Sequence, residues 1–249
     1  MTTRIAIELV PRTREALELE LQQIQQNFPH ITAINIPDLL RFDIRSWEGC
    51  AIARQWFPQT IAHIRAIDMH PYNPLHMIDY LRAHEIGEVL VIAGDPPQNH
   101  ERVIYPSTSV DIIRKFKREA PEIKVYAAID PYRNSFRVER DYIRHKLDVG
   151  ADGFFTQPFF DLRLMEMYGD QLQGQTVFWG VSPVTSEKSR FYWETRNNAI
   201  FPRSFAPTLE WNQQFARQAL EFVRRSGFDI YFMPIKTDIL KYLNGVLVE

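Results

Sequence analysis

The sequence is poor in cysteine, in net charge and in long apolar segments. Its 249 residues include a single cysteine, Cys50, which excludes an internal disulfide and a cysteine-cluster zinc site and is expected to be a small buried residue. The formal net charge is −2, so the composition favours neither nucleic acid nor a membrane surface as a partner. No apolar run is long enough to span a membrane. The first strand-like segment begins at Arg4, which leaves no room for a signal peptide, and we expect a cytoplasmic protein.

Common cofactor and metal motifs are also missing. No GxGxxG follows the first strand-like segment, which disfavours the dinucleotide-binding form of an open, doubly wound sheet. The histidines, among them His70, His76 and His100, lack metal-ligand spacing such as HExxH, and we expect them on the surface or in loops. The sequence therefore predicts no metal site.

What is present is a regular alternation of β-rich apolar runs with amphipathic stretches. Hydrophobic residues make up 45% and charged residues 24%, as in ordinary soluble domains. Eight such βα units match a (β/α)8 TIM barrel in number and length, with an open doubly wound sheet as the rival. No linker marks a boundary, so residues 1–249 are expected to form one domain. The predicted strands are 4–10, 31–36, 61–67, 88–93, 124–129, 153–156, 177–181 and 229–233.

Capping patterns predict where several helices begin. Thr13 is a plausible N-cap for a helix that follows the first strand. Asn73 and Pro74 resemble an N-cap followed by proline at the first helical position, with the helix running to Gly87. Residues 195–208 are the least regular stretch, either a loop over the barrel mouth or a long connection. Further helices are expected over 134–147, 211–225 and 236–246, and one is expected to start at Ser107 or Ser109.

The segment VLVIAGDPPQN (89–99) predicts a ligand site. Its four apolar residues suit a strand buried on both faces, Gly94 permits a tight exit, and the prolines stop the strand. Asp95 is thereby placed at the carboxyl end of a buried strand, where parallel α/β folds bind ligands. The alternative is that Asp95 only caps a turn.

Polar residues recur at the carboxyl ends of the other predicted strands and would converge on one face of a barrel. Each has a structural alternative: Glu8 in a surface turn, His63 as a hydrogen-bonded core histidine, Gln157 as a cap, Lys236 as a solvated residue near a helix start. Phe154, Phe155, Phe159 and Phe160 are first of all core residues, although some could form an apolar wall for a planar ligand. The strand-end group is Glu8, Asn35, His63, Asp95, Gln157, Ser182, Thr185 and Lys236.

These residues lie in segments that resemble the methylenetetrahydrofolate reductase family. The segments are HIRAIDMHP (63–71), VIAGDPPQ (91–98) and DVGADGFFTQPFFD (148–161). The family has HLTC-D, R-G-D-(x)-P-P and D-x-G-A-(x)4-T-Q-x-F-F-D at corresponding points, and the last pattern is the most specific. The resemblance spans nearly the whole chain in strand order and fades after about Val184.

The resemblance implies a (β/α)8 barrel that holds FAD at the carboxyl ends of its strands. Hydride would pass from NAD(P)H to the flavin and then to 5,10-methylenetetrahydrofolate, giving 5-methyltetrahydrofolate. Glu8 matches the family's general acid, Asp95 the aspartate between flavin and pterin, and Gln157 a pterin contact. Opening the folate ring needs a proton at the departing amine nitrogen, which a carboxylic acid in a poorly solvated site delivers well.

The resemblance also implies two sets of binding residues. A small-molecule folate is the expected partner. The sequence leaves open whether the chain forms a homo-oligomer. Lys146 would pair with a phosphate of the cofactor. The predicted substrate-binding residues are Asp95, Gln157, Phe159 and Lys236, and the predicted cofactor-binding residues are Asn35, His63, Gly94, Asp95, Tyr105 and Lys146.

Departures from the family pattern leave two alternatives open. The family's T-Y-G-A-G-G turn is replaced by NIPDLL (35–40), its Y-P-E-x-H-P by IDPYR (129–133), the arginine before G-D by Ala93, and the second proline of F-E-F-F-P-P by Arg12. Several of the replaced residues normally line the FAD site. Hydride could therefore move directly from NAD(P)H to the folate without a flavin. Alternatively, the chain could be a folate-binding partner subunit without turnover of its own.

Overall fold

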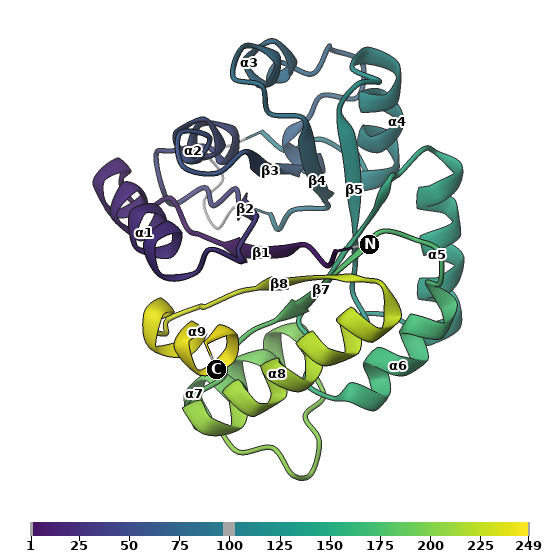
Figure 1. Ribbon diagram of the computed structural model, residues 1–249. Helices are drawn as coiled ribbons and strands as arrows, with labels where there is room; N and C mark the ends of the chain where they lie inside the picture. Colours follow the sequence, from purple (N-terminus) through teal and green to yellow (C-terminus); the bar gives the residue numbers. More distant parts are fainter. Residues whose placement is uncertain (1, 97–102, 249) are drawn as a thin grey trace.

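Eight parallel strands close into a barrel in sequence order, with β8 pairing back to β1 (Figure 1). The computed structural model describes residues 2–96 and 103–248. The (β/α)8 prediction is confirmed, and the rival open sheet is excluded. The strands are β1 Ile5–Glu8, β2 Ala33–Ile36, β3 Gln59–Arg65, β4 Glu88–Ile92, β5 Lys124–Ile129, β6 Gly153–Thr156, β7 Val177–Val181 and β8 Asp229–Phe232.

Helices surround the strands on the outside (Figure 1). Within the described residues, no helix is both long and apolar enough to cross a bilayer. The helices are α1 Arg14–Asn27, α2 Ser46–Ala53, the 3-10 helix η1 Ala66–Asp68, α3 Ile78–Ala83, α4 Ser109–Glu119, α5 Phe136–Asp148, α6 Leu162–Gln171, α7 Glu187–Asn197, α8 Leu209–Ser226 and α9 Ile239–Leu247.

Two of the capping predictions are settled by hydrogen bonds. Thr13 is the N-cap of α1, and its side chain accepts from the Ala16 amide at 3.1 Å. The N-cap of α4 is Thr108, which forms a capping box with Asp111, so neither Ser107 nor Ser109 plays this part. Ser107 instead donates to the Met69 carbonyl at 2.6 Å and ties the loop after β3 to the start of α4.

The prediction of a helix from Asn73-Pro74 to Gly87 was wrong. Helix α3 has only six residues, and its N-cap Met77 makes no side-chain cap. Contacts with α4 hold the preceding segment in another conformation: Lys115 donates to the Asn73 carbonyl, and the Leu75 amide donates to Glu119 at 2.9 Å.

The irregular stretch 195–208 is shorter than expected. Helix α7 continues to Asn197, and Asn198 ends it with a left-handed φ of 53°. The rest forms a loop whose Phe201 and Phe205 pack with Phe160.

The barrel interior is filled by one side chain from each strand. Small residues on β1 and β2 face aromatic rings on β5 to β8, so the layer fills without a channel. Side chains alternate along a strand, so residues two positions later form the next inward layer at the carboxyl end. Glu8, Asn35, His63 and Gln157 belong to that layer. The filled layer is Ala6, Ala33, Ile61, Leu90, Tyr126, Phe155, Phe178 and Tyr231.

Candidate active site

Glu8, Asn35 and His63 meet at the carboxyl ends of β1, β2 and β3. Glu8 is paired with Asn35 in the strand register. The Asn35 amide nitrogen donates to Glu8 Oε2 at 3.2 Å and lies 3.2 Å from His63 Nε2. His63 Nε2 is 3.9 Å from Glu8 Oε2. Three neighbouring strands therefore present an acid, an amide and an imidazole as one buried group.

Burial sets the charge of this group. Loss of solvent raises the pKa of Glu8 to about 7, and the Asn35 hydrogen bond opposes that rise. Burial also lowers the pKa of His63 to about 3, so the imidazole is neutral at physiological pH. A neutral ring accepts from Asn35 through Nε2, an assignment that follows from the hydrogen bonds. A carboxyl group that ionises near neutrality is suited to give up a proton.

Asn35 also carries a free acceptor. Its Oδ1 is buried and has no hydrogen-bond partner among the described residues. A buried amide oxygen without a partner is costly, and a ligand N–H would satisfy it.

A cavity of about 570 Å³ opens beside Glu8. Arg12 and Arg41 contribute positive charge to its lining, and so does Lys236, which has a left-handed φ of 54°. The structure thus brings Lys236 to the same cavity as Glu8. The lining residues are Glu8, Leu9, Val10, Arg12, Glu20, Gln23, Arg41, Pro234, Ile235, Lys236, Thr237, Asp238, Ile239 and Leu240.

Gln157 and Asp95 follow strands at the same end of the barrel. Gln157 is half-buried directly after β6, and its backbone amide donates to the Ile129 carbonyl at 2.7 Å. Asp95 is exposed, three residues beyond the end of β4. Both positions agree with the mouth location predicted from the sequence.

Sequence reasoning missed an ion-pair network that joins the end of β3 to the segments after β2, β3 and β4. Arg65 Nε contacts Asp68 at 3.0 Å, and its Nη2 donates to the Asp95 carbonyl at 2.6 Å. Asp68 is also 3.4 Å from Arg45, which pairs with the buried Asp38 at 2.5 Å. The signal available was position, because Arg65 follows His63 by two residues and so shares its inward face.

Three predicted site residues lie away from this layer. Phe159 is fully buried and packs on Trp179, with ring centroids 5.1 Å apart, so its ring has no surface for a substrate. Tyr105 is half-buried and lies edge-on to His70 at 5.0 Å. Lys146 is buried, as described below.

Of the two remaining residues of the strand-end group, one makes a structural hydrogen bond and the other is exposed to solvent. Ser182 is buried and donates to the Met233 carbonyl at 2.9 Å, which ties β7 to β8. Thr185 is exposed. Among the described residues no cluster of His, Cys, Asp or Glu could hold a metal, and His100 lies outside that part of the chain.

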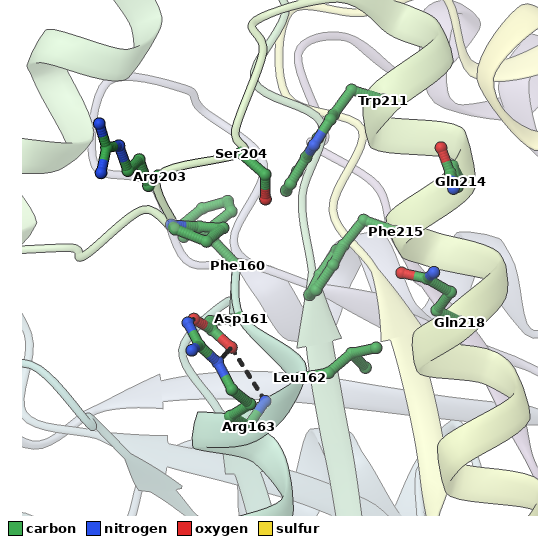
Figure 2. Close-up of a pocket in the computed structure, with 11 residues that line it drawn as sticks. Phe160, Asp161, Leu162, Arg163, Arg203, Ser204, Trp211, Gln214, Phe215 and Gln218 are labelled. Atoms are coloured by element: carbon green, nitrogen blue, oxygen red, sulfur yellow. Dashed lines mark hydrogen bonds and ion pairs between the residues drawn. The ribbon is translucent and has the colours of Figure 1, made fainter.

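A second cavity, of about 710 Å³, lies outside the strands between the start of α6, the 198–208 loop and α8 (Figure 2). Trp211 and Phe215 stack along one side at 5.5 Å, and Arg163 pairs with Asp161 on another. Phe160, one of the aromatic residues considered as an apolar wall for a ligand, lines this cavity, whereas none of the strand-end group does.

The fold is a TIM barrel with a buried acid at the carboxyl ends of its strands. A family model described as methylenetetrahydrofolate reductase matches residues 46–229, most of the chain. The protein belongs to that family, which supports a folate-related reductase activity.

Solved structures with the same fold include enzymes of other kinds. One is a 2,3-dimethylmalate lyase, 11% identical, with a TM-score of 0.60 over 94% of this chain and 75% of that chain. Another is an oxaloacetate acetylhydrolase in complex with 3,3-difluorooxalacetate, 10% identical, with a TM-score of 0.59 over 99% of this chain and 84% of that chain. At such low identity they show the fold alone.

The family generally uses FAD and NAD(P)H, so the residues that the resemblance assigns to FAD can be tested for fit. Lys146 is only 3% exposed; it donates to the Ala128 carbonyl and lies 3.8 Å from Glu139, so it cannot reach a cofactor phosphate. Arg65 and Ile67 fill the side of Gly94 on which a side chain would lie. These residues do not fit FAD in the place that the resemblance implies.

Proposed function

We propose that the protein reduces 5,10-methylenetetrahydrofolate to 5-methyltetrahydrofolate, with NAD(P)H as the source of hydride and Glu8 as the general acid. The observation that carries this proposal is the buried Glu8 carboxyl, whose pKa is raised to about 7 at the mouth of the barrel. Family membership supplies the folate chemistry, and Glu8 supplies the proton that this chemistry needs.

The reaction requires one proton and one hydride. Glu8 protonates N10 of the folate as the bond between N10 and the bridging carbon breaks, which leaves an iminium at N5. Hydride addition to that carbon gives the methyl group. The Glu8 carboxylate then regains a proton from solvent in the adjoining cavity. Asn35 donates to the Glu8 carboxyl and is itself held by neutral His63, and neither residue supplies a counter-charge that would keep the carboxyl ionised.

Polar groups at the mouth suit the remainder of a folate. The aminopyrimidine edge of the pterin carries adjacent donors and acceptors, which the Gln157 amide and the Asp95 carboxylate can pair with. Asn35 Oδ1 offers one more acceptor. The glutamate carboxylates of the folate would lie near Lys236 and Arg41 in the cavity beside Glu8.

Glu8→Gln tests the proposal, because it keeps the shape of the side chain and removes the transferable proton. We expect kcat/KM for methylenetetrahydrofolate reduction to fall by about 100-fold or more, with unchanged folate binding and circular dichroism. Glu20→Gln is the matched control, since Glu20 lines the same cavity but is paired with Arg12 at 3.2 Å. Near-normal turnover by Glu8→Gln would contradict the role of Glu8. Tight folate binding without reduction by NADH or NADPH, even with FAD supplied, would identify a folate-binding subunit instead.

A further inference from the structure

We propose that Arg65 occupies the place that the resemblance assigns to the flavin, and that hydride passes directly from the dihydronicotinamide to the folate. This inference rests on the proposed folate reduction. It concerns whether a reduced flavin or the dihydronicotinamide is the immediate donor of hydride to the folate.

Arg65 is the largest side chain that β3 sends into the mouth. It follows His63 on the inward face, and its side chain is only 9% exposed. Asp68 holds its Nε, and the Asp95 carbonyl accepts from its Nη2. A buried guanidinium fixed at two points is a permanent part of the wall.

The turn after β4 shows what Arg65 displaces. Gly94 has a φ of +86°, and a glycine there would let a flat ligand approach the backbone closely. A Cβ built on Gly94 would lie 3.1 Å from Arg65 Cβ, 3.1 Å from Ile67 Cγ1 and 3.3 Å from Arg65 Cζ. Arg65 and Ile67 therefore fill the side of Gly94 on which a side chain would lie, so an isoalloxazine ring has no room on that side.

Neighbouring charges keep Arg65 from swinging aside. Asp68 is shared with Arg45, and Arg45 is paired with the fully buried Asp38. Withdrawing Arg65 would leave Asp68 with only the longer contact to Arg45 at 3.4 Å.

Lys146, the residue that the resemblance assigns to a cofactor phosphate, is also occupied by contacts within the protein. The Lys146 ammonium donates to the Ala128 carbonyl and faces Glu139, whose side chain is 3% exposed. Turning Lys146 outward would leave the Glu139 charge buried and unpaired. Both ends of the site that the resemblance implies are therefore closed by ion pairs within the protein.

Direct transfer balances without a flavin. The C4–H bond of the dihydronicotinamide breaks with its electron pair, and that hydride forms the third C–H bond of the new methyl group. The donor leaves as the oxidised nicotinamide. Glu8 gives one proton to N10 and recovers one from water, so one proton is consumed for each hydride.

Isotope transfer distinguishes the two routes. NADH and NADPH deuterated at C4, on either face, would be used with methylenetetrahydrofolate in ordinary water, and the product would be analysed by mass spectrometry. Direct transfer predicts a methyl group that retains deuterium from one face of the donor. A reduced flavin exchanges its N5 hydrogen with water, so product without deuterium from either face would overturn the proposal while leaving the reductase function intact. Absence of product with every donor would overturn both.

Flavin binding gives a readout that is independent of turnover. The purified protein is expected to be colourless and to stay so after incubation with FAD and desalting. Arg65→Thr, which introduces the threonine of the HLTC-D pattern, is expected to raise FAD affinity by about tenfold or more in a fluorescence titration. Arg163→Thr, a change at an exposed arginine on α6, should leave FAD affinity unchanged. FAD retained by the unmodified protein, or equal FAD affinity in the two variants, would contradict the assignment of Arg65.

Discussion

At the scale of single residues, ionisation of the buried Glu8 carboxyl is expected to cost stability. Its pKa is about 7 in the folded protein against 4.5 for the free side chain, so the folded state binds more protons between these values. Stability therefore falls as pH rises through that window, by ~3 kcal/mol in all. Glu8→Gln removes this loss. We expect the variant to be more stable than the unmodified protein by about 1–3 kcal/mol near pH 8 and nearly equal near pH 5, measured by urea unfolding. A stability difference independent of pH would contradict the burial argument.

Asn35 tunes the same carboxyl in the opposite direction. Its hydrogen bond favours the carboxylate form of Glu8 and so lowers the Glu8 pKa. Asn35→Leu has nearly the same size and no hydrogen bond, so the pKa of Glu8 should rise further. A general acid must be protonated to act, and the alkaline limb of the pH profile of kcat/KM should move to higher pH. In Glu20→Gln that limb should stay in place, and a shift to lower pH in Asn35→Leu would show that the bond does not act in this way.

At the scale of elements, the turn that ends β4 depends on a glycine for two separate reasons. Gly94 and Gly174 both have left-handed φ values, +86° and +79°. A Cβ on Gly174 would meet nothing within 4 Å, whereas on Gly94 it would press on Arg65 and Ile67. Gly174→Ala should cost about 1–2 kcal/mol for backbone strain alone, and Gly94→Ala about 2–4 kcal/mol. Chemical denaturation of both variants measures the difference, and equal losses would mean that Arg65 does not pack against the turn.

The strands were easier to predict than the helices, for a physical reason. A strand buried on both faces needs an uninterrupted apolar run, and this signal gave β5, β6 and β7 their observed bounds. The start of α3 was predicted from a local cap pattern. Contacts with Lys115 and Glu119, distant in sequence, decide the conformation of that segment instead. Local signals fail where a loop is held by another element.

At the scale of the whole molecule, closure of the barrel explains which site residues could be predicted. Once the strand order is known, Glu8, Asn35 and His63 must face inward at one end of adjacent strands, and the structure places them within hydrogen-bond reach. The ends of long side chains do not follow from strand order. Lys146 matches the family by position, yet its ammonium is held by the Ala128 carbonyl, and Arg65 reaches across to the loop after β4. Resemblance to the family predicts where the backbone of a residue lies, whereas neighbouring charged and polar groups decide where the end of a flexible side chain lies.

The opposite end of the barrel is closed by a network that joins distant strands. Arg4, just before β1, pairs with Glu88 on β4 at 3.0 Å and with the Tyr126 hydroxyl on β5 at 3.1 Å. Its backbone amide donates to Asp229 on β8 at 2.8 Å. Because barrel enzymes carry their sites at the carboxyl ends of the strands, we expect this network to support stability and not turnover.

Arg4→Met tests whether the two ends of the barrel have separate roles. It leaves Glu88, whose side chain is 15% exposed, without its cation, and should cost about 2–4 kcal/mol of unfolding free energy. Arg14→Met, which removes an exposed pair with Glu18 on α1, should cost about 0.5 kcal/mol or less. Urea unfolding measures both losses, and kcat measured well below the unfolding midpoint should be unchanged in each variant. The network contacts no residue of the Glu8–Asn35–His63 group directly. A lower kcat of Arg4→Met under conditions in which the variant is fully folded would therefore show that the two ends of the barrel are coupled. Unchanged kcat with a large loss of stability is the outcome expected when one end of the barrel holds it closed and the other carries the chemistry.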